Sequence, residues 1–243
     1  MMKGYLWVLL LTMTSMECVA GLSEAAKAYN VKDYQTAFKE FLPLATNGHA
    51  SAQFNLGVMY YNGKGVAQDY SQAVMWYRKA AAQGHASAQF NLGFMYDNGK
   101  GVAQDYSQAV GWYRKAAAQG NADAQGALGF MYDKGRGVAQ DYSQAVGWYR
   151  KAGTQGHSRS LNNLGVFYEF GQLSAKNLVL AHIFYNLAAV NGNEKSVENR
   201  DQVTQQLTSA QLSEAQKIAS QWVKGQALPT ITKTYPSSSK KGK

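Results

Sequence analysis

The chain has 243 residues, of which 46% are hydrophobic and 16% charged, and it contains only three prolines. This composition excludes an intrinsically disordered chain, because it supplies enough apolar material for a packed core. The formal net charge is +9, but four lysines fall in the last eleven residues (Lys233, Lys240, Lys241 and Lys243). We therefore interpret residues 225–243 as a basic disordered tail that aids solubility, and we predict no nucleic-acid partner.

Residues 1–20 have the features of a signal peptide. Lys3 precedes an apolar run that is too short to span a bilayer, and small residues stand three positions and one position before Gly21. We predict a periplasmic or secreted protein that is cleaved between Ala20 and Gly21 and has no transmembrane segment in its mature chain. A lipid-anchored Cys18 is the less favoured alternative. Cys18 is the only cysteine, so the mature chain would have no disulfide and no thiol nucleophile.

A 36-residue repeat dominates the rest of the chain. Residues 49–84 and 85–120 agree at 33 of 36 positions, and residues 121–156 match the second of these units at 28 of 36. A more divergent copy follows at 157–192, and a partial unit at 21–48 precedes the series in the same register. The sequence therefore predicts one partial repeat, four full repeats over 49–192 and a distinct segment at 193–224.

Each repeat is predicted to form two helices joined by a tight turn. In the second full repeat, Leu92 and Met95 belong to the apolar stripe of the first helix. Gly99-Lys100-Gly101 ends that helix, because glycine tolerates the positive φ values of a tight turn. Asp105 then offers an N-cap for the second helix, with Gln108 at the spacing of a capping box. A unit of this size cannot bury its own faces, so neighbouring repeats must stack.

The repeats share the pattern L-G-x-x-Y-x-x-G-x-G-V-x-x-D-x-x-x-A-x-x-W-x-x-K-A-A-x-x-G, which begins at Leu56 and recurs 36 residues later and, with Gly153 in place of the second alanine, 72 residues later. This pattern resembles the Sel1-like repeat, a longer relative of the tetratricopeptide repeat, over about residues 21–224. The resemblance implies an all-α fold, namely a right-handed superhelical solenoid of helix–turn–helix repeats. In the fourth repeat Leu173 replaces the second turn glycine and Phe184 replaces the tryptophan, so we expect a different turn there and the same hydrophobic pattern.

The C-terminal segment is predicted to cap the stack with two helices. The first covers residues 194–207, and the second begins after Thr208, with Gln211 at capping-box spacing. Family members resemble this chain in ending with such a pair.

We find no catalytic, cofactor-binding or metal site, and we predict that the protein is not an enzyme. His49, His85 and His157 share one register position, but equivalent residues of neighbouring repeats are about 8–10 Å apart and cannot share a zinc ion whose ligands lie about 2 Å away. The Gly63–Gly65 turn lacks the spacing of a phosphate loop. We see no motif that combines a serine, a histidine and an acid. The tryptophans at 76, 112 and 148 are interpreted as repeat core.

Differences between near-identical repeats indicate where a partner binds. The first two full repeats differ only at Val58/Phe94, Tyr61/Asp97 and Met75/Gly111. In tetratricopeptide-like solenoids the first helices line the concave surface, and by resemblance the groove residues here are Phe54, Val58, Tyr61, Phe90, Phe94, Asp97, Phe130, Asp133, Glu169 and Phe170. They predict an aromatic stripe beside a row of acids, which suits a peptide with apolar anchors and some basic residues. Drift after recent duplication is the alternative explanation.

The expected function is that of a monomeric, non-catalytic scaffold that binds a protein or peptide in the bacterial envelope or outside the cell. Binding of cell-wall glycan or an anionic surface through the basic tail is one alternative. The other is the β-lactam-binding or hydrolysing activity assigned to cysteine-rich relatives, whose paired cysteines this chain lacks.

Overall fold

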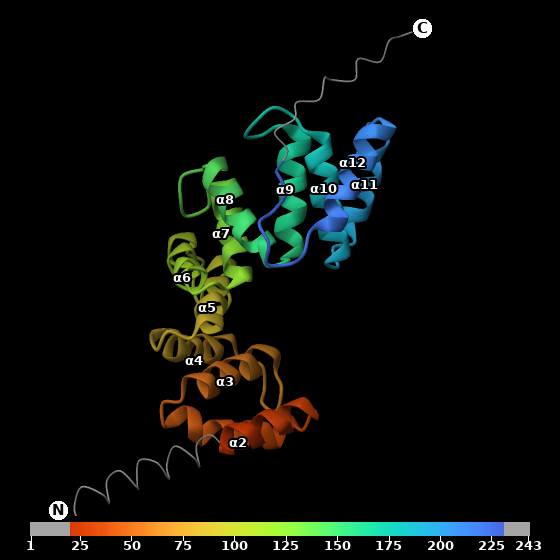
Figure 1. Ribbon diagram of the computed structural model, residues 1–243. Coiled ribbons are helices and arrows are strands. Elements are labelled where there is room, and N and C mark those ends of the chain that lie inside the picture. Colours follow the sequence, from red (N-terminus) through yellow and green to blue (C-terminus); the bar gives the residue numbers. More distant parts are fainter. Residues whose placement is uncertain (1–19, 231–243) are drawn as a thin grey trace, which may run out of the picture. The chain divides into compact units, whose positions relative to one another are not determined.

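The computed structural model describes residues 20–230. The predicted signal peptide, apart from its last residue, and residues 231–243 of the predicted tail lie outside this range. Residues 20–30 are helical. The further helices in the described part are α2 (Tyr34–Thr46), α3 (Ala50–Asn62), α4 (Tyr70–Ala82), α5 (Ala86–Asn98), α6 (Tyr106–Ala118), α7 (Ala122–Lys134), α8 (Tyr142–Thr154), α9 (Ser158–Phe170), α10 (Leu178–Val190), α11 (Lys195–Thr204) and α12 (Ser209–Gln221) (Figure 1).

The predicted helix pairs are confirmed. The four full repeats correspond to α3 with α4, α5 with α6, α7 with α8, and α9 with α10. An aspartate caps the second helix as expected: Asp69 accepts a hydrogen bond from the Gln72 backbone N–H at 3.0 Å, and Asp105 accepts one from that of Gln108 at 2.9 Å. Residues 20–230 contain no β-strand. The predicted fold class, an all-α solenoid of tandem helix–turn–helix repeats, is therefore confirmed.

None of the helices between residues 20 and 230 has the length and apolar character that crossing a membrane requires.

Two glycines shape the turn inside each of the first three full repeats, and the second of them has a role beyond its own turn. Gly99 and Gly101 have φ values of 63° and 68°. A Cβ atom on Gly101 would overlap the carbonyl group of Tyr70, the first residue of α4. Gly65 lies in the same way against the Tyr34 carbonyl at the start of α2. The second glycine is therefore required because the turn packs directly against the backbone of the preceding repeat.

The turn of the fourth repeat differs from the others, as the sequence predicts. Leu173 takes the place of the second glycine and is 50% exposed. The first glycine, Gly171, keeps a φ of 66°. A Cβ atom on it would approach the Ser174 carbonyl oxygen at 2.9 Å and the Lys176 nitrogen at 3.0 Å. The corresponding glycines of the other three repeats instead lie against a glutamine side chain.

The chain divides into two compact units after Ala116. In the N-terminal unit, a glycine in each first helix lies against a buried tyrosine of the second helix. A Cβ atom on Gly57 would come within 2.5 Å of the Tyr77 ring, and one on Gly93 within 2.7 Å of the Tyr113 ring. Both tyrosines are only 2% exposed. The missing side chain therefore lets the two helices of a repeat approach closely over an aromatic ring.

Glutamines connect consecutive repeats. Gln53 Nε2 donates to the Ala45 carbonyl oxygen at 3.0 Å, and Gln89 Nε2 donates to that of Ala81 at 3.2 Å. Both glutamines are buried, so these bonds satisfy polar groups that water cannot reach. In the C-terminal unit Gln125 Nε2 donates in the same way to the Ala117 carbonyl oxygen.

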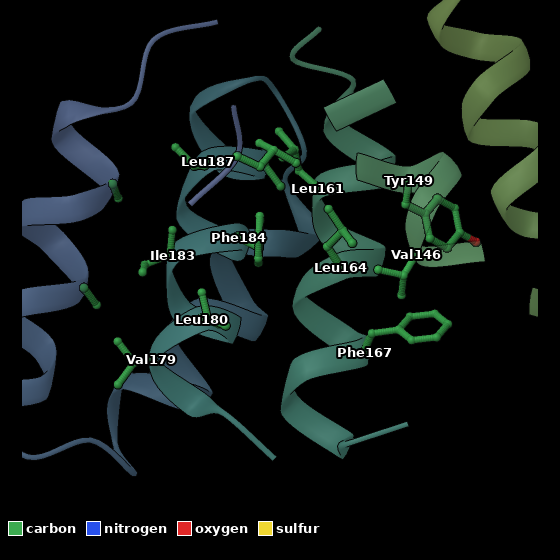
Figure 2. Packing of buried hydrophobic residues seen from close by; sticks show 14 of the residues in the cluster. Val146, Tyr149, Leu161, Leu164, Phe167, Val179, Leu180, Ile183, Phe184 and Leu187 are labelled. Atoms are coloured by element: carbon green, nitrogen blue, oxygen red, sulfur yellow. The ribbon is translucent and has the colours of Figure 1, made fainter. Parts of the chain in front are cut away.

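The apolar core of the C-terminal unit contains more buried residues than either core cluster of the N-terminal unit. It is formed mainly by α8, α9 and α10 (Figure 2). Nine residues of α10 are buried. Phe184 replaces the tryptophan of the other repeats and is fully buried. In Figure 2 it lies on the side of α10 that faces α9. The hydrophobic pattern of the fourth repeat is therefore retained despite the substitution.

The chain ends, in its described part, with the predicted helix pair and a segment that folds back. α11 is shorter than the predicted helix over 194–207, and Thr208 forms the predicted capping box with Gln211. Residues 225–230, at the start of the predicted tail, contact α8: the Gly225 N–H donates to the Thr154 carbonyl oxygen at 2.8 Å. Leu228 is 4% exposed and belongs to the core of this unit.

Candidate functional site

The predicted groove residues of the N-terminal unit lie on α3 and α5 and are half-buried. The Phe54 ring stacks on the imidazole of His85, with centroids 4.7 Å apart. Burial lowers the pKa of His85, so the stacked imidazole is neutral at pH 7. The Phe90 ring lies 5.7 Å from that of Tyr113. These rings are held by the repeat core while part of each remains accessible to solvent.

Two further predicted residues, Tyr61 and Phe94, belong to a group that we call the Lys100 cluster (Lys100, Tyr61, Tyr70 and Phe94). Lys100 Nζ lies 5.0, 5.2 and 5.6 Å from the ring centroids of Tyr61, Tyr70 and Phe94. These distances are those of cation–π contacts. The ammonium group also donates to the Tyr61 hydroxyl at 2.9 Å, and this hydrogen bond raises the pKa of Lys100. The lysine is therefore charged at neutral pH.

A second group, the Lys64 cluster (Lys64, Tyr29 and Tyr34), repeats this arrangement one repeat earlier. Lys64 Nζ lies 5.0 and 4.9 Å from the two ring centroids and donates to the Tyr29 hydroxyl at 3.2 Å. Both lysines stand between the two turn glycines. The sequence predicted these segments as tight turns without the spacing of a phosphate loop. The recurrence of a lysine in two glycine turns was the available signal for these clusters, but the tyrosines that contact each lysine lie in the preceding repeat.

The predicted row of acids is engaged with tyrosines of the same repeats. The Tyr113 hydroxyl donates to Asp97 Oδ2 at 3.3 Å, and the Tyr185 hydroxyl donates to Glu169 Oε2 at 2.6 Å. Burial, together with the adjacent carboxylate, raises the pKa of both tyrosines. The phenols therefore stay protonated and act as donors to the carboxylates.

The third acid of the row, Asp133, is only 8% exposed and pairs with Lys134 at 3.0 Å. All three carboxylates thus have partners within their own unit. The attraction of this row for basic residues of a peptide stays a prediction, since a hydrogen bond from a tyrosine hydroxyl leaves the charge on the carboxylate that accepts it.

The first-helix surface of the C-terminal unit differs from that of the N-terminal unit. Phe130 is half-buried and lies 5.2 Å from the Arg136 guanidinium group. Asn162 stands where the first repeat has Phe54, and it accepts hydrogen bonds from Ser196 and Asn199 of α11 at 2.8 and 3.0 Å. The capping helix thus covers this position. Phe170, in contrast, is 68% exposed.

The histidine register position is the start of the first helix, as expected. His85 Nδ1 accepts from the Ala88 backbone N–H at 3.3 Å, and Asn121 Oδ1 accepts from that of Ala124 at 2.8 Å. Over residues 20–230, no group of three or more histidine, cysteine or acidic side chains is arranged to hold a metal ion.

The structure brings together a serine, a histidine and an acid that the sequence did not reveal as a set. His157 Nδ1 lies 2.8 Å from Ser160 Oγ, and its Nε2 lies 3.4 Å from Asp123 Oδ1. A hydrolase triad also joins a serine, a histidine and an acid, but there Nε2 faces the serine and Nδ1 faces the acid, so the ring nitrogens are exchanged here. Ser160 is moreover fully buried, and the same Nδ1 also caps the Ser160 backbone N–H. A buried hydroxyl cannot reach a substrate carbonyl, so we assign this group a structural role.

Gly126 makes room for this group, whose serine and acid are also absent from the first two full repeats: alanine stands there at the position of Ser160 and serine at that of Asp123. A Cβ atom on Gly126 would come within 2.6 Å of the His157 ring, so the imidazole fills the space that a phenylalanine takes in the first two repeats. The hydrogen bond from His157 lowers the pKa of Asp123. No local motif predicts the group, because its members come from adjacent repeats.

The opposite side of each repeat, formed by the second helix, also presents lysines over aromatic rings. Lys79 and Lys115 lie 4.3 and 4.1 Å from the ring centroids of Trp76 and Trp112. Trp76 is 6% exposed and belongs to the core, whereas Trp112 is half-buried. The prediction of a tryptophan core thus holds fully for Trp76 and partly for Trp112.

Comparison with known proteins identifies relatives of the whole repeat region. A family profile described as Sel1 repeat matches residues 50–85, 86–121, 122–157 and 158–193. A Sel1 repeat protein from Oxalobacter formigenes is 32% identical, with a TM-score of 0.73 over 82% of this chain and 83% of that chain. A protective antigen of uropathogenic Escherichia coli is 39% identical, with a TM-score of 0.72 over 79% of this chain. The match spans only 42% of the antigen. Curated protein sequences show no match.

Proposed function

Because this chain belongs to the Sel1 repeat family, whose members are generally protein-interaction scaffolds, we propose that it is a non-catalytic scaffold that binds a protein or peptide on its first-helix surface. We place this role in the bacterial envelope or outside the cell, on the basis of the signal-peptide features of residues 1–20. The proposed contact residues are those assigned from the sequence, with the half-exposed rings of α3 and α5 as the main anchors.

This proposal rests on the partial solvent exposure of the aromatic residues in the N-terminal unit. Phe54, Phe90 and Phe94 are packed on rigid helices, yet part of each ring faces solvent. Interfaces are anchored by such side chains, because they bury a large apolar area and lose little conformational freedom on binding. Their setting in stacked helices also keeps the surface preformed.

The experiment is an affinity pull-down from envelope and culture fractions, read by mass spectrometry. The wild-type chain is compared with exchanges between the first two repeats, Val58→Phe with Tyr61→Asp and Phe94→Val with Asp97→Tyr. Each exchange introduces residues that the neighbouring repeat already carries, so folding should be preserved. Substitution of the exposed Val190 and Val223 by serine provides a control at exposed apolar residues outside this surface.

The proposal predicts that the exchanges change the recovered partners, whereas the control substitutions do not. Recovery that is unchanged in all exchange variants contradicts it. A chain lacking residues 231–243 tests the alternative that partners bind the basic tail. Only that alternative predicts that partners are lost after the truncation. The truncation begins at 231 because Leu228 is part of the core.

A further inference from the structure

We propose that the partner segment recognised by the N-terminal unit is acidic and apolar, and that its carboxylates bind Lys64 and Lys100 while an aliphatic or aromatic side chain packs on Val58 and Phe94. This inference rests on the proposed function and specifies its partner. It reverses the charge that the sequence alone predicted for the ligand.

The first line of support is the geometry of the two lysines. Lys64 and Lys100 occupy the same place in consecutive repeats, next to the C-terminal ends of α3 and α5. Their ammonium groups are positioned by neutral tyrosine rings and by one tyrosine hydroxyl each. A lysine ammonium has three donors, so each keeps donors for an incoming carboxylate without giving up its present contacts.

The second line of support is that, in the described part of the N-terminal unit, neither lysine forms an ion pair and the first helices carry little negative charge. Among the described residues, no ion pair involves Lys64 or Lys100. The helix α3 contains no charged residue, and Asp97 is the only one in α5. Asp97 already accepts a hydrogen bond from Tyr113. The charge balance of this surface is therefore positive, which favours an acidic ligand over a basic one.

The third line of support is the apolar neighbourhood of the same lysine. Phe94 lies under the Lys100 ammonium at 5.6 Å and 6.4 Å from the Tyr61 ring. Val58 and Phe94 both pack on the core cluster of this unit and are half-buried. An anchoring side chain on these two residues would exclude water from the adjacent lysine, and a carboxylate pair is stronger where water is excluded.

The C-terminal unit provides an internal contrast. In the third repeat Arg136 stands at the position of Lys64 and Lys100 and lies 5.2 Å from the Phe130 ring, and in the fourth repeat Gln172 stands there. The C-terminal unit therefore has no lysine at this position.

The test is selection of peptides from a random 12-residue phage-displayed library on the full chain. The enriched peptides are then synthesised with a fluorescent label, and their affinities are measured by fluorescence anisotropy. The key variant is Lys64→Gln with Lys100→Gln. The matched control is Lys79→Gln with Lys115→Gln, which removes the same charge from lysines that also lie over aromatic rings, but on the second helices.

We expect the enriched peptides to carry an excess of aspartate and glutamate beside leucine or phenylalanine. The Lys64/Lys100 variant should bind them about fivefold more weakly, and the Lys79/Lys115 control should bind them like the wild type, since exposed ion pairs contribute modestly. Binding to wild type should weaken as the salt concentration rises, and this salt dependence should be smaller in the Lys64/Lys100 variant.

Enriched peptides without an excess of acid that still depend on Val58 and Phe94 would overturn this inference and leave the proposed function intact. Failure to enrich any peptide would contradict the proposed function itself. Equal losses in the two lysine variants would show that only net charge matters. Phosphatidylglycerol vesicles that bind the wild type but not the Lys64/Lys100 variant, without any acidic peptide doing so, would assign the lysines to a membrane surface and refute the peptide proposal.

Discussion

The contact between Gly93 and Tyr113 allows a sharp test of how the repeat is packed. In Gly93→Ala, the new Cβ would lie 2.7 and 2.8 Å from two carbon atoms of the Tyr113 ring and 3.2 Å from the Ala109 carbonyl oxygen. Carbon atoms normally approach to about 3.5–4.0 Å. The ring is buried and rigid, so either α5 or α6 must shift. Gly111→Ala in the same repeat is the matched control, because no heavy atom lies within 4 Å of its new Cβ.

The two variants should move stability in opposite directions. Overpacking costs about 1–3 kcal/mol, and alanine in place of a helical glycine returns about 0.5–1 kcal/mol. Gly93→Ala should therefore lose about 1–2 kcal/mol, while Gly111→Ala should gain about 0.5–1 kcal/mol. For a chain of this size, a difference of about 2 kcal/mol between them corresponds to roughly 4–8 °C in Tm.

The assay is urea unfolding followed by far-UV circular dichroism, with thermal unfolding as a second measure. Transition midpoints are compared directly, because tandem repeats need not unfold in two states. If Gly93→Ala proves as stable as Gly111→Ala, the close approach of the two helices over the tyrosine ring is not what requires glycine in the first helix.

Four further predictions follow from individual contacts. Tyr185→Phe removes the hydroxyl that donates to Glu169 and should lower the free energy of unfolding by about 1 kcal/mol, whereas unchanged urea midpoints would contradict the assigned bond. Gln89→Ala removes the buried hydrogen bond to the Ala81 carbonyl, which still accepts from the Gly84 backbone N–H, and should cost about 0.5–1.5 kcal/mol, which the same unfolding assay measures. Burial lowers the pKa of His182 in the folded chain, so the free energy of unfolding should fall as the pH drops below about 6.5. The three preceding repeats carry valine at this position. In His182→Val, the urea midpoint should therefore depend less on pH between pH 7 and 5.5. A chain ending at residue 230 should be as stable as the full chain, but one ending at 224 should lose about 2 kcal/mol with Leu228, and equal stability of the two truncations would refute the role of that segment.

The repeat boundaries, helix pairs and caps were predictable because they depend on local residue patterns that recur every 36 positions. Glycine turns and aspartate caps act within a few residues of themselves, and repetition removes the ambiguity of a single match. Gln53 and Gln89 were not recognised as connecting residues. Their partners are backbone carbonyl groups of the preceding repeat, which carry no side-chain signature.

The candidate surface was only partly predictable for the same physical reason. Positions such as Phe54 and Phe94 were assigned by resemblance to tetratricopeptide-like solenoids, and they lie on the first helices as expected. The state of a charged side chain depends instead on what faces it from another helix. Asp97 faces a tyrosine and Lys100 faces three rings, and neither relation can be read from spacing along one helix. Leu228 lies outside the repeat pattern, so its burial had no periodic signal at all.

The contact between the partial repeat and the first full repeat is equivalent to the contact between the first and the second full repeat. In each, a glutamine binds an alanine carbonyl and a turn glycine lies against a tyrosine carbonyl of the repeat before it. If a complete 36-residue unit were lost in this region, Gln89 would meet the Ala45 carbonyl. If a unit were duplicated, the equivalent glutamine of the new copy would meet the Ala81 carbonyl. In both cases the glutamine finds the same kind of partner as before. Such a chain can change the length of its binding surface by whole units in a single genetic event, without any compensating substitution.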